Sequence, residues 1–352
     1  MATSSFLSGK AVLVVSPFLF ALAIIIAKLA LNDGVQVHAF NALRNTLAFL
    51  FTYIFRNRKR GSELSPSLSN CDHNFVFWSV LCGLCNALGM TSSAVALAHL
   101  NTAMFSFMLG LTVVMTPLLG HFLPFKSTKL NTLGWFAVCL SVVGTLLLEG
   151  CIGDMASCFE DGNWYSGAAL GAALFYSLYS YFIGLGSESV EASLLTQGAL
   201  CVSCLALTAV MVLFIYVIDD DKSSNNNTSS LFLHFNYSSR QLMFTVGVAA
   251  LEAVAWQYET YAVVAVGASK AAMAIATEAP MTTLLAYLIL NESLSQSEYL
   301  GCAMVFLAAV IASWEGGDSG DKVVGNQVDL RQDEDQIQLL DQSSIAEDEE
   351  SL

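Results

Sequence analysis

The chain is poor in charged residues, and this shortage decides its class. Only 12% of its 352 residues are Asp, Glu, Lys or Arg, and 55% are hydrophobic. Soluble domains carry about 25% charged residues. The mean hydropathy is +0.61. A chain of this composition cannot cover its surface with polar side chains, so we expect a polytopic membrane protein and no nucleic-acid partner.

Other absences exclude further classes. The phosphate-binding sequence GxxxxGK[ST] does not occur, which disfavours direct use of ATP. None of the predicted spans contains an aspartate, whereas aspartyl intramembrane proteolysis needs two. A buried serine–histidine site is also disfavoured, because these histidines fall at span boundaries or in loops: His38, His99, His121 and His234. We therefore expect a protein that is not an enzyme.

What is present is a series of long apolar stretches. About 20 apolar residues match a hydrocarbon core about 30 Å thick. Ten stretches reach about this length: residues 11–31, 38–56, 75–98, 101–123, 130–149, 164–185, 190–218, 241–265, 268–290 and 296–314. The first is too long for a signal peptide and lacks a small-residue cleavage site. The sequence therefore predicts an all-α fold with ten transmembrane helices.

The ten spans form two sets of five, and the second set weakly repeats the first. Placing Gly134 on Gly301, an offset of 167, also superposes Leu133, Val138, Leu140 and Val143 on Leu300, Val305, Leu307 and Val310. Because five is odd, the second copy enters the membrane in the opposite orientation, as in many secondary transporters. We expect inverted five-helix repeats at residues 11–149 and 164–314, joined by a loop at 150–163.

Basic residues near span ends mark the cytosolic side. They gather after the second span and after the fourth: Arg56, Arg58, Lys59, Arg60, then Lys126 and Lys129. Both connections are even-numbered, so they lie on the side of the amino-terminal residues 1–10. With ten spans, we expect both termini in the cytosol.

Two connections are then luminal or extracellular. The loop 219–240 carries three N-glycosylation acceptor patterns, at Asn226, Asn227 and Asn236. The loop 150–163 holds Cys151 and Cys158, which could form a disulfide in an oxidising compartment or remain two free thiols.

Two further cysteine pairs lie inside apolar spans. Cys82 and Cys85, and likewise Cys201 and Cys204, have the spacing of redox or metal pairs. Without histidine partners, and in apolar helices, they are typical of small packing residues. We expect neither a metal nor a cofactor.

The carboxyl-terminal tail, residues 315–352, holds twelve acidic residues against Lys322 and Arg331 and has few large apolar residues. This composition is typical of a disordered segment. Asp335 precedes the pair Leu339 and Leu340 in the manner of a dileucine signal, which adaptors read to sort membrane proteins. We expect an endomembrane such as the vacuole, lysosome or endosome, with the plasma membrane as the alternative.

Ionisable residues within spans are expensive, at roughly 2.5–3.5 kcal/mol each on insertion scales. In the eighth span Glu252, Trp256 and Glu259 are spaced by four and three, which places them on one helix face. This face could line a cavity that binds a cation, an amine or a proton. The alternative is a purely structural pairing with a buried base or a neighbouring hydroxyl.

The ninth span contains Glu278 and, two residues later, Pro280. Proline removes a helix hydrogen bond and kinks the helix, and broken helices expose backbone groups at the midplane of transporters. Glu278 is expected at the depth of Glu252, and close carboxylates cannot easily ionise together, which suits proton coupling. Arg44, in the second span, is the candidate counter-charge or a contact for an anionic group, whereas Lys28 is expected to extend to the interface.

Several of these residues carry a family resemblance. Ala279–Pro280, Leu284–Leu285, Asn291–Glu292 and Gly301 with the apolar run to Ser313 have a spacing that resembles EamA-type members of the drug/metabolite transporter superfamily. Arg44, in the segment 40–44, is similar to an arginine of that family. The resemblance implies ten helices and alternating access, usually with proton coupling or exchange. It leaves the substrate open, since members carry amino acids, drugs, nucleotide sugars and other metabolites.

The first repeat departs from this pattern. The offset of 167 places Phe125 opposite Glu292 and Val113 opposite Pro280, while Pro117 comes one turn later. The glutamates at 252, 259 and 278 fall opposite Cys85, Ser92 and Leu111. The carboxylates therefore belong to the second half alone.

A secondary active transporter of a small organic metabolite is the function that these features favour. Its rivals are a nucleotide-sugar exchanger of the secretory pathway and a receptor or scaffold that does not transport. The exchanger needs basic residues around phosphates, and the spans offer Arg44 and Lys28, with Lys270 at a boundary. The sequence weakly favours a neutral, zwitterionic or cationic substrate.

Overall fold

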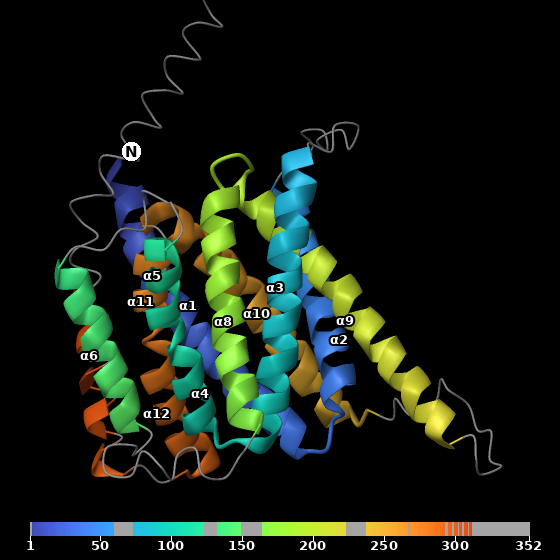
Figure 1. Cartoon of the computed structure of the whole chain (residues 1–352). Helices are drawn as coiled ribbons and strands as arrows, with labels where there is room; N and C mark the ends of the chain where they lie inside the picture. The colour runs from blue at the N-terminus through green and yellow to red at the C-terminus, as the bar shows by residue number, and fades with distance from the viewer. Residues whose placement is uncertain are drawn as a thin grey trace, which may run out of the picture.

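The computed structural model is helical and contains no strand in the residues that it describes (Figure 1). These are residues 2–59, 73–122, 132–148, 164–222, 237–266, 268–292, 295–297, 299–301, 303–304, 306–308 and 310–311. The helices are α1 Ala2–Asn32, α2 Val37–Lys59, α3 His73–His99, α4 Thr102–Gly110, α5 Thr112–Phe122, α6 Thr132–Leu148, α8 Trp164–Gly186, α9 Ala192–Lys222, α10 Ser239–Val266, α11 Ala268–Ile275 and α12 Glu278–Leu290. An apolar helix over Tyr299–Ala308 follows.

Length and composition qualify five stretches as membrane spans: Val15–Asn32, His73–His99, Thr102–Phe122, Trp164–Gly186 and Ala192–Leu213. The helices α2 and α10 are long enough, at 23 and 28 residues, but fall outside this group. Polar side chains lower their hydropathy, among them Arg44 in α2 and Glu252 and Glu259 in α10. Both long helices that are not apolar enough to qualify as spans, α2 and α10, thus carry embedded charges.

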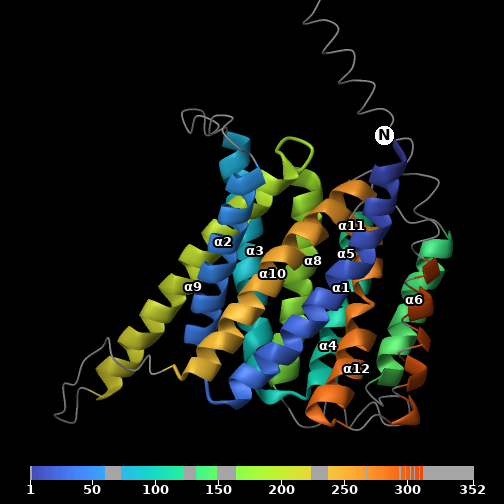
Figure 2. The same ribbon diagram turned by 180° about the vertical axis from the view of Figure 1, so that it is seen from behind.

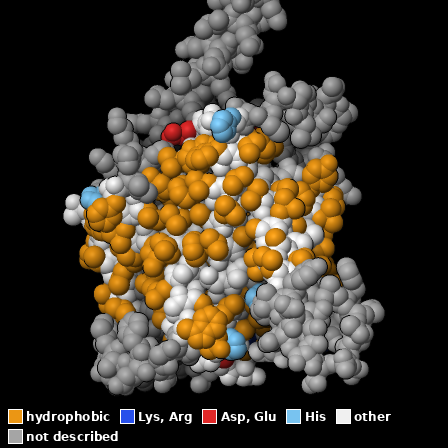
Figure 3. Space-filling view, turned by 45° about the vertical axis from the view of Figure 1, so that its right-hand side comes forward, with side chains coloured by type: hydrophobic (Ala, Val, Ile, Leu, Met, Phe, Trp, Pro, Cys, Tyr) orange, Lys and Arg blue, Asp and Glu red, His pale blue; other side chains and the backbone are white. Residues whose placement is uncertain are grey.

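The outer surface of the bundle is apolar. Figure 3 shows one face almost covered with hydrophobic side chains, with acidic and histidine side chains near its margins. Large apolar side chains point outward, and Leu205 in α9 and Leu288 in α12 are 67% and 64% exposed. Apolar surface of this extent is untypical of a soluble monomer and marks a surface that contacts lipid or protein. The protein is an integral membrane protein.

Two helical passages are interrupted near the middle of the bundle. Leu111 separates α4 from α5, and Ala276 and Thr277 separate α11 from α12. The offset of 167 places Leu111 on Glu278, so the interruptions occur at corresponding places in the two halves. The broken passages also pack against each other, α4 with α12 and α5 with α11 (Figure 1).

Local sequence explains the second interruption. Pro280 has no N–H and cannot donate to the carbonyl of Ala276, four residues earlier. That carbonyl instead accepts a hydrogen bond of 3.3 Å from the N–H of Ala279, which closes a tighter, three-residue turn. The Oγ1 of Thr277 donates to the carbonyl of Ala274, at 2.8 Å. The chain therefore turns between α11 and α12 and starts a new helix at Glu278.

Close packing fixes the rest of the bundle. Figure 2 shows α10 between α1 and α2, and α10 packs against both. The helices α3 and α9 approach so closely at Gly83 that a Cβ there would lie 2.6 Å from the Cβ of Val202. Small residues permit this approach between membrane helices.

Polar contacts join helix ends at the end of the bundle where α1 finishes. Lys28 Nζ donates to the carbonyls of Leu97 and Leu100, at 2.8 and 2.9 Å, at the carboxyl end of α3. It therefore binds the end of another helix, where a cation is favoured, rather than simply extending to the interface. Thr102 Oγ1 donates to Glu292 Oε1 at 3.0 Å, which ties α4 to the residue pair that follows α12.

Candidate binding cavity

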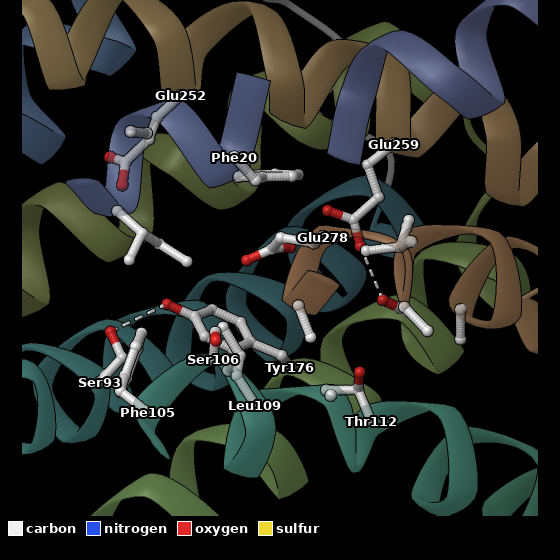
Figure 4. Close-up of a pocket in the computed structure, with 18 of the residues that line it drawn as sticks. Phe20, Ser93, Phe105, Ser106, Leu109, Thr112, Tyr176, Glu252, Glu259 and Glu278 are labelled. Carbon is white, nitrogen blue, oxygen red and sulfur yellow. Dashed lines mark hydrogen bonds between the residues drawn. The ribbon is translucent and has the colours of Figure 1, made fainter. Parts of the chain in front are cut away.

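A cavity of about 90 Å³ lies within the bundle, beside the two helix interruptions (Figure 4). A buried water needs about 10–15 Å³, so there is room for several waters or for the polar head of a small solute. The described lining residues come from α1, α2, α3, α4, α5, α8, α10, α11 and α12. Leu97 and Phe105 in the lining belong to one buried apolar cluster, and Trp256 belongs to another.

Arg44 and Glu252 form an ion pair in this cavity. Arg44 Nη1 lies 3.3 Å from Glu252 Oε1, and the two side chains are only 5% and 10% exposed. The Arg44 guanidinium also lies 5.2 Å from the centre of the Phe40 ring. Arg44 Nε and Glu252 Oε2 are buried without a hydrogen-bond partner. The pair thus neutralises one carboxylate and leaves one of its oxygens available.

Glu259, two turns along α10, is held by a neutral group. Ser180 Oγ in α8 donates a hydrogen bond of 2.9 Å to Glu259 Oε1. Both side chains are buried and line the cavity. A hydroxyl satisfies one acceptor but brings no positive charge, so Glu259 is hydrogen-bonded and not neutralised.

Glu278 is the first residue of α12. The amino end of a helix carries a partial positive charge that favours an acidic side chain. In Figure 4 the Glu278 carboxylate lies between those of Glu252 and Glu259. The turn between α11 and α12 therefore places a third carboxylate inside the bundle, among the other two.

Aromatic rings surround Trp256, which is 5% exposed. Its ring centre lies 5.1 Å from that of Phe20 in α1, 5.7 Å from that of Tyr176 and 5.1 Å from that of Tyr179, both in α8. The Phe20 and Tyr179 contacts are edge-to-face, a favoured arrangement of aromatic pairs. Phe20, Tyr176 and Trp256 line the cavity, so its wall between the glutamates is aromatic.

Two residues of α3 position the side chain of Tyr176. Its hydroxyl lies 3.4 Å from Ser93 Oγ in α3. Behind its ring, Gly89 in α3 leaves the necessary space, since a Cβ there would lie 2.9 Å from Tyr176 Cε1. Gly89 and Ser93, one turn apart on α3, thus fix the ring against the cavity.

Hydroxyl groups complete the polar lining: Ser93, Ser106, Thr112, Thr116, Tyr176 and Ser180. Thr116 is 1% exposed, and its Oγ1 has no hydrogen-bond partner. Unpaired buried hydroxyls are unfavourable. A ligand or a water in the cavity would satisfy this one.

The structure brings together the residues that the sequence pointed to. Arg44, Glu252, Trp256, Glu259 and Glu278 all line the same cavity. Pro280 lies two residues beyond Glu278 in α12, outside the lining.

Sequence reasoning missed the contribution of α1, α3, α4 and α5 to the cavity. Phe20, Ser93, Ser106, Thr112 and Thr116 come from these helices. In the sequence they are ordinary small polar or aromatic residues of apolar spans. No spacing or unusual residue type in the sequence marked them as cavity-lining.

Three groups of predicted residues lie outside the residues that the structure describes. They are the glycosylation acceptors Asn226, Asn227 and Asn236, the cysteines Cys151 and Cys158, and the sorting residues Asp335, Leu339 and Leu340.

Comparisons with known proteins agree with the fold. The family model described as the EamA-like transporter family matches residues 7–149 and 163–314. No curated protein sequence matches significantly. Twenty-eight solved chains match. One of them, titled "Crystal structure of protein", aligns with a TM-score of 0.57 and 16% identity, over 90% of this chain and 100% of that chain. At this identity the likeness establishes the fold alone.

Proposed function

Because the chain belongs to the EamA-like transporter family, matched over both of its halves, we propose that it is a secondary active transporter of a small organic metabolite. This membership confirms the resemblance inferred from residues such as Pro280, Glu292 and Gly301. Members of the family are membrane transporters of the drug/metabolite superfamily. The proposed mechanism is alternating access, driven by protons or by exchange.

The observation that carries the proposal is a cavity built jointly by the two matched segments. Residues 7–149 supply Phe20 and Arg44, and residues 163–314 supply Tyr176, Glu252 and Glu278. The Arg44–Glu252 ion pair joins the two segments inside this cavity. Transporters with inverted repeats bind their substrates between the repeats, where broken helices meet. In this chain the cavity lies between the two matched segments, and the interrupted passages α4–α5 and α11–α12 contribute to its lining.

Ten crossings follow from this proposal. Each interrupted passage, α4–α5 and α11–α12, then counts as one crossing, and the shorter apolar helices Thr132–Gly144 and Tyr299–Ala308 supply the fifth and tenth. The corresponding positions of the two interruptions support an inverted repeat over 11–149 and 164–314. The basic residues Arg56, Arg58 and Lys59 at the carboxyl end of α2 support cytosolic termini.

The charges in the cavity support coupling to a cation. Three carboxylates share it, and Arg44 is the one Lys or Arg among the described lining residues. If all three ionise, the cavity carries a net charge of −2 in a medium where unpaired charge is expensive. It therefore favours uptake of positive charge, either as protons or as part of the solute.

A nucleotide-sugar exchanger is less well supported. Phosphates need cations or free helix amino ends. Arg44 already pairs with Glu252, and the amino end of α12 is occupied by the Glu278 carboxylate, which leaves the amino end of α5, at Thr112, as the free helix end among the described lining residues. A receptor or scaffold would not require a cavity with embedded carboxylates.

Transport by the purified protein in liposomes tests the proposal. Liposomes loaded with a metabolite mixture at pH 7.5 are placed at external pH 5.5, and mass spectrometry follows which solutes move. We expect at least one solute to move faster than in liposomes that lack the protein. Glu278→Gln should abolish the part of this transport that the pH gradient drives. Transport that is absent at every gradient, from protein that remains folded, would contradict the proposal.

The proposed location is an endomembrane, with sorting adaptors as partners of the tail. Asp335, Leu339 and Leu340 support it through their order in an acidic segment. Alanine at both leucines should move a fluorescent fusion to the cell surface. An unchanged distribution would remove the sorting role.

A further inference from the structure

The cavity has charge, apolar surface and unpaired polar atoms that together select one kind of head group. We propose that the solute carries an ammonium group, which binds between Glu278 and Glu259 in competition with protons, while its carbon substituents contact Phe20, Tyr176 and Trp256. This rests on the proposed transport function and names the substrate class of the same site.

The first reason is the distribution of counter-charges. Glu252 has the Arg44 guanidinium at 3.3 Å, and Glu259 has only the Ser180 hydroxyl at 2.9 Å. Glu278 has the partial charge of its own helix end. Two of the three carboxylates thus lack a full positive partner, and they are neighbours in Figure 4. A single ammonium between them supplies the missing charge.

The second reason is the unpaired polar atoms, of which Thr116 Oγ1 lies outside the acidic cluster. Thr116 Oγ1 and Glu252 Oε2 line the cavity and are buried without partners, in residues that are 1% and 8% exposed. Glu252 Oε2 accepts hydrogen bonds, whereas the Thr116 hydroxyl both accepts and donates them. An ammonium donates up to three, whereas a carboxylate or phosphate donates none when ionised. Arg44 Nε and Trp256 Nε1, also in lining residues, are unpaired donors, so an ammonium satisfies the unpaired acceptors while an acceptor elsewhere on the solute satisfies the donors.

The third reason is the aromatic wall. Rings of Trp, Tyr and Phe attract cations through their faces, and such contacts gain strength when water is excluded. The ring of Trp256 is surrounded by those of Phe20, Tyr176 and Tyr179. Apolar groups of Leu97 and Leu109 continue the lining. This surface fits the carbon substituents of an organic amine better than a hydrated inorganic cation.

Basic groups that would attract an anion are engaged elsewhere. Lys28 Nζ is bound to the carbonyls of Leu97 and Leu100 and is absent from the described lining. Arg44 is held by Glu252 and lies beside the Phe40 ring. The amino end of α5, at Thr112, faces the cavity with a neutral residue, which can contact a polar group of the solute.

Matched test compounds decide the question by thermal unfolding in detergent. Phenethylamine provides the ammonium, 2-phenylethanol has the same carbon skeleton without charge, and 3-phenylpropionate carries the opposite charge. UDP-glucose represents the exchanger alternative. Each is tested from 10 µM to 10 mM at pH 5.5 and pH 7.5. The amine stays protonated at both values, because alkylammonium groups lose their proton near about pH 10.

We expect the amine alone to raise the unfolding temperature. Because it displaces protons from carboxylates, its affinity rises with pH, by up to about tenfold per pH unit for each proton displaced. Glu278→Gln should remove this pH dependence and weaken binding at least tenfold. Glu278→Asp, which keeps the charge, should retain part of the pH dependence and part of the affinity for the amine. Glu188→Gln, in the exposed turn between α8 and α9, is the matched control and should change neither.

The outcomes separate the inference from the transport proposal. Equal binding of the alcohol, or preferential binding of either anion, would overturn the ammonium assignment. An amine affinity that is independent of pH would overturn the proton competition. If no compound stabilises the protein, the assignment also falls. The liposome experiment with a metabolite mixture judges transport separately, since a solute of another class would still move.

Discussion

Arg44 and Glu252 lie 3.3 Å apart as a buried ion pair that joins the two matched halves of the chain. Removing one partner of a buried pair leaves an uncompensated charge and costs about 3–5 kcal/mol. We expect Arg44→Met to lower the free energy of unfolding by about this amount, measured by chemical denaturation in detergent. The double variant Arg44→Met/Glu252→Met should be markedly more stable than the single Arg44→Met variant, because it removes both charges.

A double-mutant cycle checks this coupling. Glu252→Met supplies the second single substitution, which leaves Arg44 without its counter-charge. If the effects at positions 44 and 252 simply add, the two groups do not stabilise each other, and the pair makes no net contribution.

Gly89 controls the shape of the cavity through Tyr176. A Cβ at this position would lie 2.9 Å from Tyr176 Cε1, so Gly89→Ala pushes the ring toward the cavity and disturbs its contact with Ser93. We expect the variant to fold and to bind solutes at least tenfold more weakly, measured by the ligand-induced shift of the unfolding temperature. Tyr176→Phe, which keeps the ring, should weaken binding less.

Gly167→Ala is the matched control for this substitution. A Cβ at Gly167 has nothing within 4 Å, and the residue is also in a membrane helix, α8. Alanine there is favoured over glycine by helix propensity, by about 1 kcal/mol. Equal losses of binding in the two variants would show that the effect does not come from Tyr176.

Lys28 joins α1 to the carboxyl end of α3. Its ammonium gives two hydrogen bonds, to the carbonyls of Leu97 and Leu100, and hydrogen bonds to charged groups contribute about 1.5–3 kcal/mol each. Because the side chain is only partly buried, we expect less than the full sum, so Lys28→Met should destabilise the protein by about 2–4 kcal/mol in chemical denaturation. Selectivity among solutes should stay unchanged, because Lys28 is outside the described lining. A variant as stable as the parent chain would mean that water replaces the ammonium.

The sequence predicted the carboxylate face because helical spacing alone places Glu252, Trp256 and Glu259 on one side of a helix. It also indicated that Glu278 lies beside a break, since Pro280 follows it. In the structure Glu252, Trp256, Glu259 and Glu278 line one cavity, and Pro280 lies just outside its lining. Patterns within one helix are readable because they depend only on the helix period.

Relations between helices were not readable in the same way. The interruption at Leu111 has no proline, since Pro117 comes later in α5, and it becomes recognisable only through its counterpart at Ala276–Thr277. The bond from Ser180 to Glu259 joins hydroxyl and carboxylate across two helices. Such contacts depend on the rotation of each helix in the bundle, which hydropathy does not determine.

The proposed topology has a direct test in the loop 219–240. If the termini are cytosolic and α9 and α10 meet on the opposite side, the acceptor sites Asn226, Asn227 and Asn236 face the compartment where glycans are added. We expect a glycosidase to increase the electrophoretic mobility of the protein made in a eukaryotic cell. Replacing all three asparagines with glutamine should abolish this change, because no acceptor site then remains in this loop. As a control, an engineered Asn-Gly-Thr sequence within residues 60–72 should stay unmodified. Glycan addition there, with none in the loop 219–240, would reverse the orientation and place the basic residues at the carboxyl end of α2 on the luminal side.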